Sequence, residues 1–123
     1  VNDVNMAIQI YINNEVTSVV SVIKAEANIN PHWMLVENGK DIQLFNGNTL
    51  KNIQDRRQDL PEAFIRNDFV YVLTPKNLYE LKPNLYGDSV KLFKISENRY
   101  DIDINTEKDF LIAEAIFDKL EFN

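Results

Sequence analysis

Two groups of side chains in this sequence have the types and spacing for anion or metal chemistry. The first is the run of residues 56–61, Arg-Arg-Gln-Asp-Leu-Pro, with Arg66 and Asn67 just downstream. Guanidinium groups bind carboxylates and phosphates through paired, planar hydrogen bonds, and neighbouring amides can bind hydroxyl groups. This run therefore suits a loop that binds an acidic sugar. The alternative is that both arginines form ion pairs with acidic neighbours on a solvated loop. Those neighbours are Asp55, Asp59 and Glu62.

The second group is the run of residues 101–105, Asp-Ile-Asp-Ile-Asn. In a strand, a period of two places Asp101, Asp103 and Asn105 on one side. Carboxylate and amide oxygens at the end of a strand suit Mg²⁺, which takes one or two carboxylates and completes its shell with water and phosphate oxygens. The alternative is a strand whose polar side faces water before a helix begins.

Other residues argue against further chemistry. His32 is the only histidine and stands beside Trp33, the only tryptophan. One histidine without a partner motif does not make a metal site, so we expect packing or hairpin-base roles for both. The three glycines are isolated from one another, so the chain has no glycine-rich loop with a lysine to hold a triphosphate.

Helical and extended patterns alternate along the chain, as expected for an α/β fold with a sheet between layers of helices. Asn38-Gly39 between two apolar runs predicts a hairpin, and Thr106 followed by Asp109 resembles a helix-capping box. The expected elements are a helix at 3–14, strands at 18–23, 69–73 and 90–95, a hairpin at 33–45, a loop at 51–61, a short helix at 75–81 and a helix at 107–121.

Composition limits the possible partners. The chain has 123 residues, of which 45% are hydrophobic and 26% charged, as in one globular domain. Its formal charge of -6 argues against a broad nucleic-acid or anionic-membrane surface. The lack of cysteine fits a cytoplasmic protein, and no apolar run is long enough to span a membrane. Because the sequence starts without methionine and enters a helical pattern at once, we expect a piece of a longer protein.

Taken in order, these motifs strongly resemble the acylneuraminate cytidylyltransferase family, which includes CMP-sialic acid synthetases and relatives acting on other nonulosonic acids or on 3-deoxy-octulosonate. The resemblance covers nearly the whole chain but only the second half of the family. The residues that carry it are Ser18 to Val22, the run 56–61, Phe64, Asn67, Tyr71, the run 103–107, Asp109, Phe110, Ala113 and Glu114.

The resemblance implies roles for particular side chains. Arg57 matches the arginine that meets the sugar acid, with Gln58 beside it. Asn67 and Tyr71 match residues of the strand that lines the sugar pocket. One departure is Asp68, which stands where a glycine usually follows the asparagine.

The resemblance also implies a metal site. Asp103 matches the first of two acidic residues that hold Mg²⁺, and Asn105 occupies the position of the second. An amide oxygen is neutral and binds Mg²⁺ more weakly than a carboxylate does. Trp33 is a further departure, because it stands near the position of a lysine that contacts the sugar in many sialic-acid enzymes.

For the fold, the resemblance implies a partial three-layer Rossmann-like nucleotidyltransferase sheet with an added β-hairpin dimerisation region. Residues 1–123 would form the C-terminal part of one cytidylyltransferase domain, with residues 30–60 as the hairpin region. The N-terminal nucleotide-binding half would lie outside this chain, so we expect no turnover from the chain alone. The complete enzyme would be a homodimer that uses CTP, an acidic sugar and Mg²⁺, and releases pyrophosphate.

Two other functions stay open. One is a non-catalytic module that binds a sugar acid or associates with itself, which Asn105 and the missing nucleotide loop would favour. The other is a different sugar nucleotidyltransferase or a glycosyltransferase with a similar sheet, because an aspartate that holds a metal at a strand end recurs there and fold does not fix function.

Overall fold

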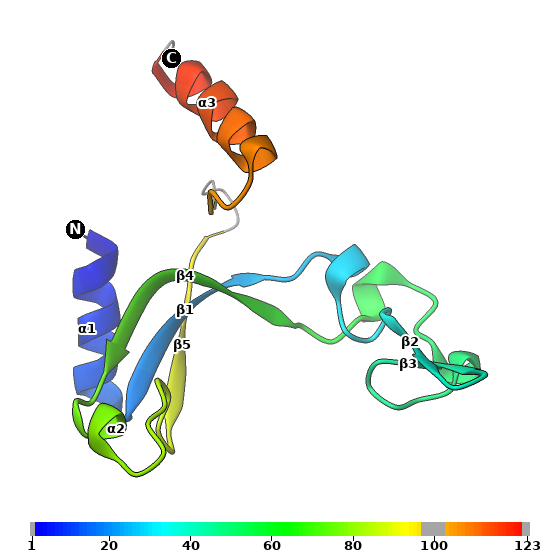
Figure 1. Cartoon of the computed structure of the whole chain (residues 1–123), viewed down its shortest axis with the longest axis horizontal. Helices are drawn as coiled ribbons and strands as arrows, with labels where there is room; N and C mark the ends of the chain where they lie inside the picture. The colour runs from blue at the N-terminus through cyan, green and yellow to red at the C-terminus, as the bar shows by residue number, and fades with distance from the viewer. Residues whose placement is uncertain (1, 97–102, 122–123) are drawn as a thin grey trace.

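The chain forms a mixed α/β structure, seen in a computed structural model that describes residues 2–96 and 103–121 (Figure 1). The elements alternate as the sequence patterns predicted. In order they are α1 (Asn2–Asn14), β1 (Ser18–Lys24), η1 (Ala27–Ile29), β2 (Leu35–Asn38), β3 (Asp41–Leu44), η2 (Leu50–Asn52), η3 (Arg57–Asp59), β4 (Phe64–Leu73), α2 (Lys76–Tyr79), β5 (Val90–Lys94) and α3 (Glu107–Glu121).

The main sheet has three strands in the order β4-β1-β5. The central strand β1 runs antiparallel to β4 and parallel to β5. Its side chains are buried from Ser18 to Val22. The continuous β-branched run in this strand predicted a strand covered on both sides, and that prediction is confirmed.

Helix α1 packs on one face of this sheet (Figure 1). Ala7, which is fully buried, lets the helix approach Val19 and Phe93 of the two parallel strands. A hydrogen bond of 2.6 Å between the Tyr11 hydroxyl and the Thr74 hydroxyl fastens the helix to the end of β4. The core of the molecule therefore lies between α1 and the sheet. No helix in the described part of the chain is both long and apolar enough to cross a membrane.

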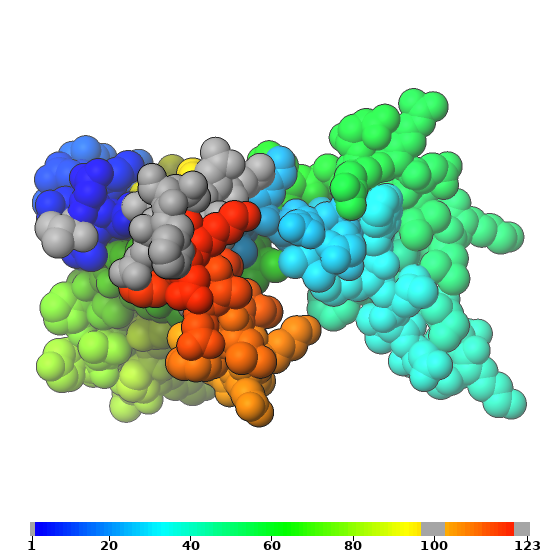
Figure 2. All heavy atoms as spheres, turned by 90° about the horizontal axis from the view of Figure 1, so that it is seen from above, coloured from blue at the N-terminus to red at the C-terminus, as the bar shows by residue number. Residues whose placement is uncertain are grey.

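Residues 25–63 leave the sheet after β1 and return at β4, and we call this segment the arm. It stands away from the sheet and α1 in two perpendicular views (Figures 1 and 2). It contains the predicted hairpin, in which β2 and β3 pair antiparallel across a turn where Gly39 has a φ of 68°. The Trp33 indole nitrogen donates a 2.7 Å hydrogen bond to the Gln54 carbonyl, which ties the hairpin to the loop that follows it.

Two of the differences between the structure and the predictions concern candidate site residues. Strand β4 begins at Phe64 rather than at residue 69, because its first part pairs with the end of β1. Residues 103–105 form no strand, so the predicted strand end there is wrong for these residues, and Asp101 lies outside the described residues. The backbone nitrogens of Asn105 and Thr106 instead donate to the Asp109 carboxylate, at 3.2 and 2.8 Å. These hydrogen bonds cap the start of α3 and use backbone donors that strand pairing would need.

Candidate functional site

A cavity of about 1110 Å³ lies where the arm joins the sheet. Strands β1 and β5 are parallel, and their carboxyl ends both reach it. Ligands of α/β proteins bind outside the carboxyl ends of parallel strands, so its position in the fold marks this cavity as a candidate site. The lining residues come from the end of β1, the two ends of the arm and the chain after β5. They are Ile23, Lys24, Ala25, Glu26, Ala27, Ile29, Asn30, Arg57, Gln58, Leu60, Pro61, Glu62 and Ser96.

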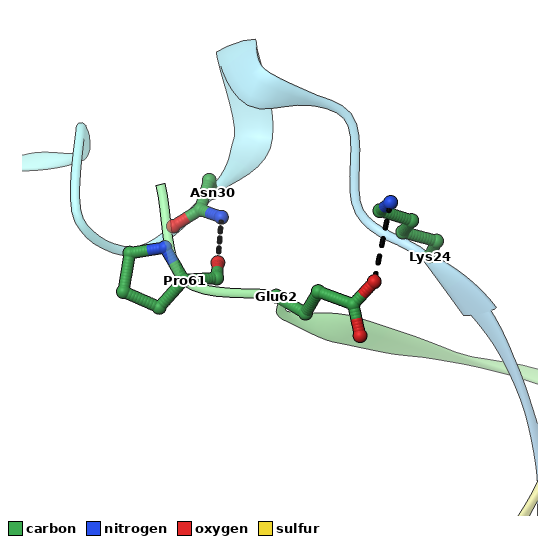
Figure 3. A network of polar contacts seen from close by, with 4 residues as sticks. All are labelled: Lys24, Asn30, Pro61 and Glu62. Atoms are coloured by element: carbon green, nitrogen blue, oxygen red, sulfur yellow. Dashed lines mark hydrogen bonds and ion pairs between the residues drawn. The ribbon is translucent and has the colours of Figure 1, made fainter. Parts of the chain in front are cut away.

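Polar contacts close the base of the arm and set the shape of the cavity (Figure 3). The Asn30 amide nitrogen, in a side chain only 3% exposed, donates to the Pro61 carbonyl at 2.9 Å. Lys24 Nζ lies 3.3 Å from Glu62 Oε1. These contacts join the segment that leaves β1 to the segment that enters β4. The arm is therefore anchored to the sheet at the wall of the cavity.

Arg57 and Gln58, two of the residues predicted to bind substrate, both line this cavity. They lie in η3, a single turn that ends where Leu60 N donates to the Arg57 carbonyl. Among the described residues, the guanidinium of Arg57 has neither a hydrogen-bond partner nor a carboxylate within 4.0 Å, and the same holds for Arg56. The described structure thus shows neither arginine in an ion pair with Asp55, Asp59 or Glu62, and Glu62 pairs with Lys24. The hydrogen-bond donors of the Arg57 guanidinium therefore have no partner among the described residues.

Asn67 lies in β4 at an irregularity where the register with β1 shifts between Val20 and Val22. The buried Ser21 hydroxyl donates to Asn67 Oδ1 at 2.6 Å and accepts hydrogen bonds from the backbone nitrogens of Phe69 and Val70. One serine thus satisfies the polar groups that the bulge removes from the ladder. Asn67 Nδ2 is buried and has no hydrogen-bond partner in the described structure.

The residues around Tyr71 form a separate polar group on β4. The Tyr71 hydroxyl donates to the Asp68 carboxylate, and this hydrogen bond raises the pKa of Tyr71. The Arg66 guanidinium donates to the Tyr86 hydroxyl, which raises the pKa of Arg66. Asp68 has a φ of 53°, in the left-handed region that favours glycine. Neither Asn67 nor Tyr71 belongs to the described lining of the Arg57 cavity.

Asp103 and Asn105, the predicted metal ligands, face each other in the exposed segment before α3. The Asn105 amide nitrogen donates to Asp103 Oδ2 at 2.8 Å. The nearby Asp109 carboxylate is committed to the helix cap, because it accepts hydrogen bonds from the backbone and hydroxyl of Thr106. These hydrogen bonds lower the pKa of Asp109.

This pair fits Mg²⁺ in part. One carboxylate and one amide oxygen on an exposed segment meet the minimum that Mg²⁺ needs, since water and phosphate oxygens usually complete its octahedral shell. No group of three acidic, histidine or cysteine side chains in the described residues could form a fuller set of ligands. Asp103 and Asn105 do not line the Arg57 cavity in the described structure.

The predicted site residues therefore lie in three places: the cavity at the base of the arm, the bulge of β4, and the segment before α3. Sequence motifs alone missed Lys24, Asn30, Glu62 and Ser96 as part of the cavity. For Lys24, Ser96 and Glu62 the available signal was their position at or just after the ends of β1 and β5, or just before β4, because strand ends in an α/β sheet line such sites.

No protein-family model matches the sequence, and no curated protein matches it. A functional interpretation therefore rests on the geometry of the cavity and on the motifs of the chain itself.

Proposed function

We propose that this chain forms the sugar-binding part of a cytidylyltransferase that transfers CMP from CTP to the anomeric hydroxyl of an acidic sugar and releases pyrophosphate. The observation that carries this proposal is the unpaired guanidinium of Arg57, which lines a large cavity beside Gln58. A guanidinium without a carboxylate partner, in a hollow at the carboxyl ends of parallel strands, suits the carboxylate of an acidic ligand.

The backbone of Asp68 is a second support. The family resemblance places a glycine at this position, and Asp68 has a φ of 53°. Left-handed backbone geometry is the physical reason why glycine would be favoured there, and aspartate tolerates it better than most other residues do. The departure from the family pattern thus keeps the backbone geometry that the pattern requires.

The arrangement of the sheet is compatible with part of a Rossmann-like fold. Such folds combine parallel strands with helices on the sheet faces, as β1, β5 and α1 do here. In the described structure β5 has β1 on one side only, so its other edge could accept further strands of a larger sheet. We place the nucleotide-binding strands and the CTP loop in that larger sheet.

The residues of this chain would act mainly by binding and orientation. Arg57 would hold the sugar carboxylate through paired hydrogen bonds, and Gln58 would contact a neighbouring hydroxyl or amide group of the sugar. Holding the sugar in this way keeps its anomeric hydroxyl in line with the α-phosphorus of CTP. Asp103 and Asn105 would hold Mg²⁺, which neutralises charge on the phosphates when it is bound.

The arm would form the homodimer contact. Leu35, Ile42 and Phe45 of the hairpin are 58%, 43% and 64% exposed. Apolar side chains gathered on a protruding hairpin mark an interaction surface. We expect light scattering to give the mass of two chains at micromolar concentration, and the mass of one chain over a wide concentration range would count against this contact.

Calorimetric titration of the chain with N-acetylneuraminate and with 3-deoxy-octulosonate tests the proposed ligand class. We expect at least one of these acids to bind, and its methyl ester, which lacks the charge, to bind much more weakly. Arg57→Gln should reduce affinity for the acid by about 10- to 100-fold, the usual effect of losing a hydrogen bond between charged groups.

Arg56→Gln is the matched control, because Arg56 has the same charge one position away and does not line the cavity. It should change affinity by less than about twofold, as expected for an exposed charge. Equal binding of acid and ester, equal effects of the two arginine variants, or no binding of either acid at millimolar concentration would each contradict the proposal.

A non-catalytic module that binds sugar acids is the second candidate. The observation that favours it is the orientation of Asn105, whose amide nitrogen rather than its oxygen faces Asp103. A cation could bind there only after the Asn105 side chain rotates to present its amide oxygen beside the carboxylate. Binding of Mg²⁺ to the chain that is lost in Asp103→Asn would count against this candidate.

A further inference from the structure

A smaller hollow of about 240 Å³ adjoins the Arg57 cavity. Its lining residues come from the ends of β1 and β5 and the start of β4, and they are Lys24, Glu62, Phe64, Lys94, Ile95 and Ser96. Three of these residues, Lys24, Glu62 and Ser96, also line the larger cavity. The two hollows therefore share a wall, and a ligand in one lies beside a ligand in the other.

Both lysines of the small hollow come from the ends of neighbouring parallel strands. Lys24 is the last residue of β1 and Lys94 the last residue of β5. Val22 lies opposite Lys94, so Lys24 is two residues further along β1 and its side chain is on the same face of the sheet. Two ammonium groups thus lie on one face at the edge where α/β proteins bind ligands.

The contacts of Lys94 leave its hydrogen-bond donors available for an anion. Lys94 Nζ lies 4.3 Å from the centre of the Phe64 ring, and no carboxylate of the described residues lies within 4.0 Å of it. An aromatic face orients an ammonium group without using its hydrogen-bond donors as a carboxylate would. Lys24 pairs with Glu62, but the two side chains are 47% and 60% exposed, so a stronger anion can compete for Lys24.

Positive charge at the two hollows is a local feature, because the protein as a whole is negatively charged. The chain carries a formal charge of -6, so its surface as a whole does not attract anions. Across the two hollows, Lys24, Arg57 and Lys94 outnumber the carboxylates of Glu26 and Glu62. The lining of the two hollows is therefore locally positive in an acidic protein.

We propose that Lys94 and Lys24 form a subsite for a phosphate group beside the carboxylate subsite of Arg57. The inference rests on the proposed function, because the product of that reaction carries a carboxylate and a phosphodiester on the same carbon atom. Adjacent subsites for these two anions match that chemistry. Lys94 would be a specificity-determining residue that separates the nucleotide-linked sugar from the free sugar acid.

Calorimetric titration of the 123-residue chain with CMP-N-acetylneuraminate and with N-acetylneuraminate tests the inference. Lys94→Gln should weaken binding of the CMP-linked sugar by about tenfold and leave binding of the free sugar acid within about twofold. Lys91→Gln is the matched control: Lys91 is an exposed lysine of the same strand that lines neither hollow. It should leave both affinities unchanged.

Two further ligands, CMP and inorganic pyrophosphate, distinguish the source of the phosphate. Weaker binding of CMP to Lys94→Gln supports a nucleotide phosphate, and weaker binding of pyrophosphate alone assigns the subsite to the leaving group. Unchanged binding of all phosphate ligands to Lys94→Gln, or equal losses for the CMP-linked and the free sugar, would overturn the inference. If Arg57→Gln left the affinity for the sugar acid unchanged, the proposed function would be overturned instead. The results with CMP and pyrophosphate would still decide the phosphate subsite.

Discussion

The sheet with α1 and the arm are held together in different ways. The sheet and α1 share a core of buried apolar side chains, among them Ala7, Val19 and Phe93. In the arm, all of which the structure describes, Leu44 is the one large apolar side chain that is nearly fully buried, at 1% exposed. Elsewhere the arm relies on turns, on hydrogen bonds such as that of Trp33, and on the contacts at its base.

The cavity takes one wall from each of these regions. Lys24 ends β1 and Ser96 follows β5, whereas Arg57 and Gln58 belong to the arm. The side chains proposed to bind the sugar, Arg57 and Gln58, therefore belong to the less buried region, whereas the proposed phosphate-binding lysines belong to the sheet. A ligand that bridges the two walls should therefore stabilise the arm against the sheet.

The largest expected effect distinguishes the buried side chains of the arm from those of the sheet. Leu44→Ala should cost about 2–5 kcal/mol, because it removes the main buried side chain of the arm. Hydrogen exchange should show lost protection in β2 and β3, while amides of β1 stay protected. Val19→Ala, at a fully buried position of the sheet, should lower protection throughout the described chain. Equal loss of protection in β1 for both variants would show that the two regions unfold as one unit.

Two glycines with nearly the same positive φ, one beside the sheet and one in the arm, extend this comparison. Gly87 has a φ of 66°, and an added Cβ would lie 2.6 Å from Thr17 Oγ1 and 2.8 Å from Asn77 Oδ1. Gly39 in the arm has a φ of 68° and nothing within 4 Å of that position. Both alanine variants carry a backbone penalty of about 1–2 kcal/mol, and the clash at Gly87 adds about 1–3 kcal/mol. Urea unfolding should rank Gly87→Ala as clearly less stable, and similar losses would contradict the packing around Thr17.

The smallest effect concerns α3, which belongs to neither region. Hydrogen bonds from Thr106 lower the pKa of Asp109, so its contribution to the helix cap is complete at neutral pH and is lost as the pH falls through that lowered pKa. Asp109→Asn should reduce the circular dichroism signal at 222 nm slightly at neutral pH, and the difference should vanish in strong acid. A difference that persists in strong acid would show that the carboxylate charge is not the cause.

Sequence reasoning succeeded where the signal was local. The β-branched run from Ser18, the Asn38-Gly39 turn and the Thr106 to Asp109 cap each depend on residues close together in the chain, and each formed as expected. The pattern at 103–105 failed because the same segment also contains the cap, and the cap prevailed.

Long-range pairing was not predictable in this way. Whether Glu62 would meet Lys24 or Arg57 depends on the register that places Lys24 opposite Phe64. The placement of Lys24 and Lys94 beside the same hollow likewise depends on the parallel register of β1 and β5. Those registers join segments far apart in the sequence, and no short motif encodes them.

An amide NMR titration of the chain with the sugar acid that binds most tightly locates the ligand directly. We expect the amide chemical-shift changes to concentrate at the cavity wall, in residues 23–30 and 57–62 and at Ser96, and we expect Arg57→Gln to remove them. Shifts concentrated instead at the β4 bulge around Asn67, or in residues 103–106, with the cavity wall unchanged, would contradict this position of the ligand.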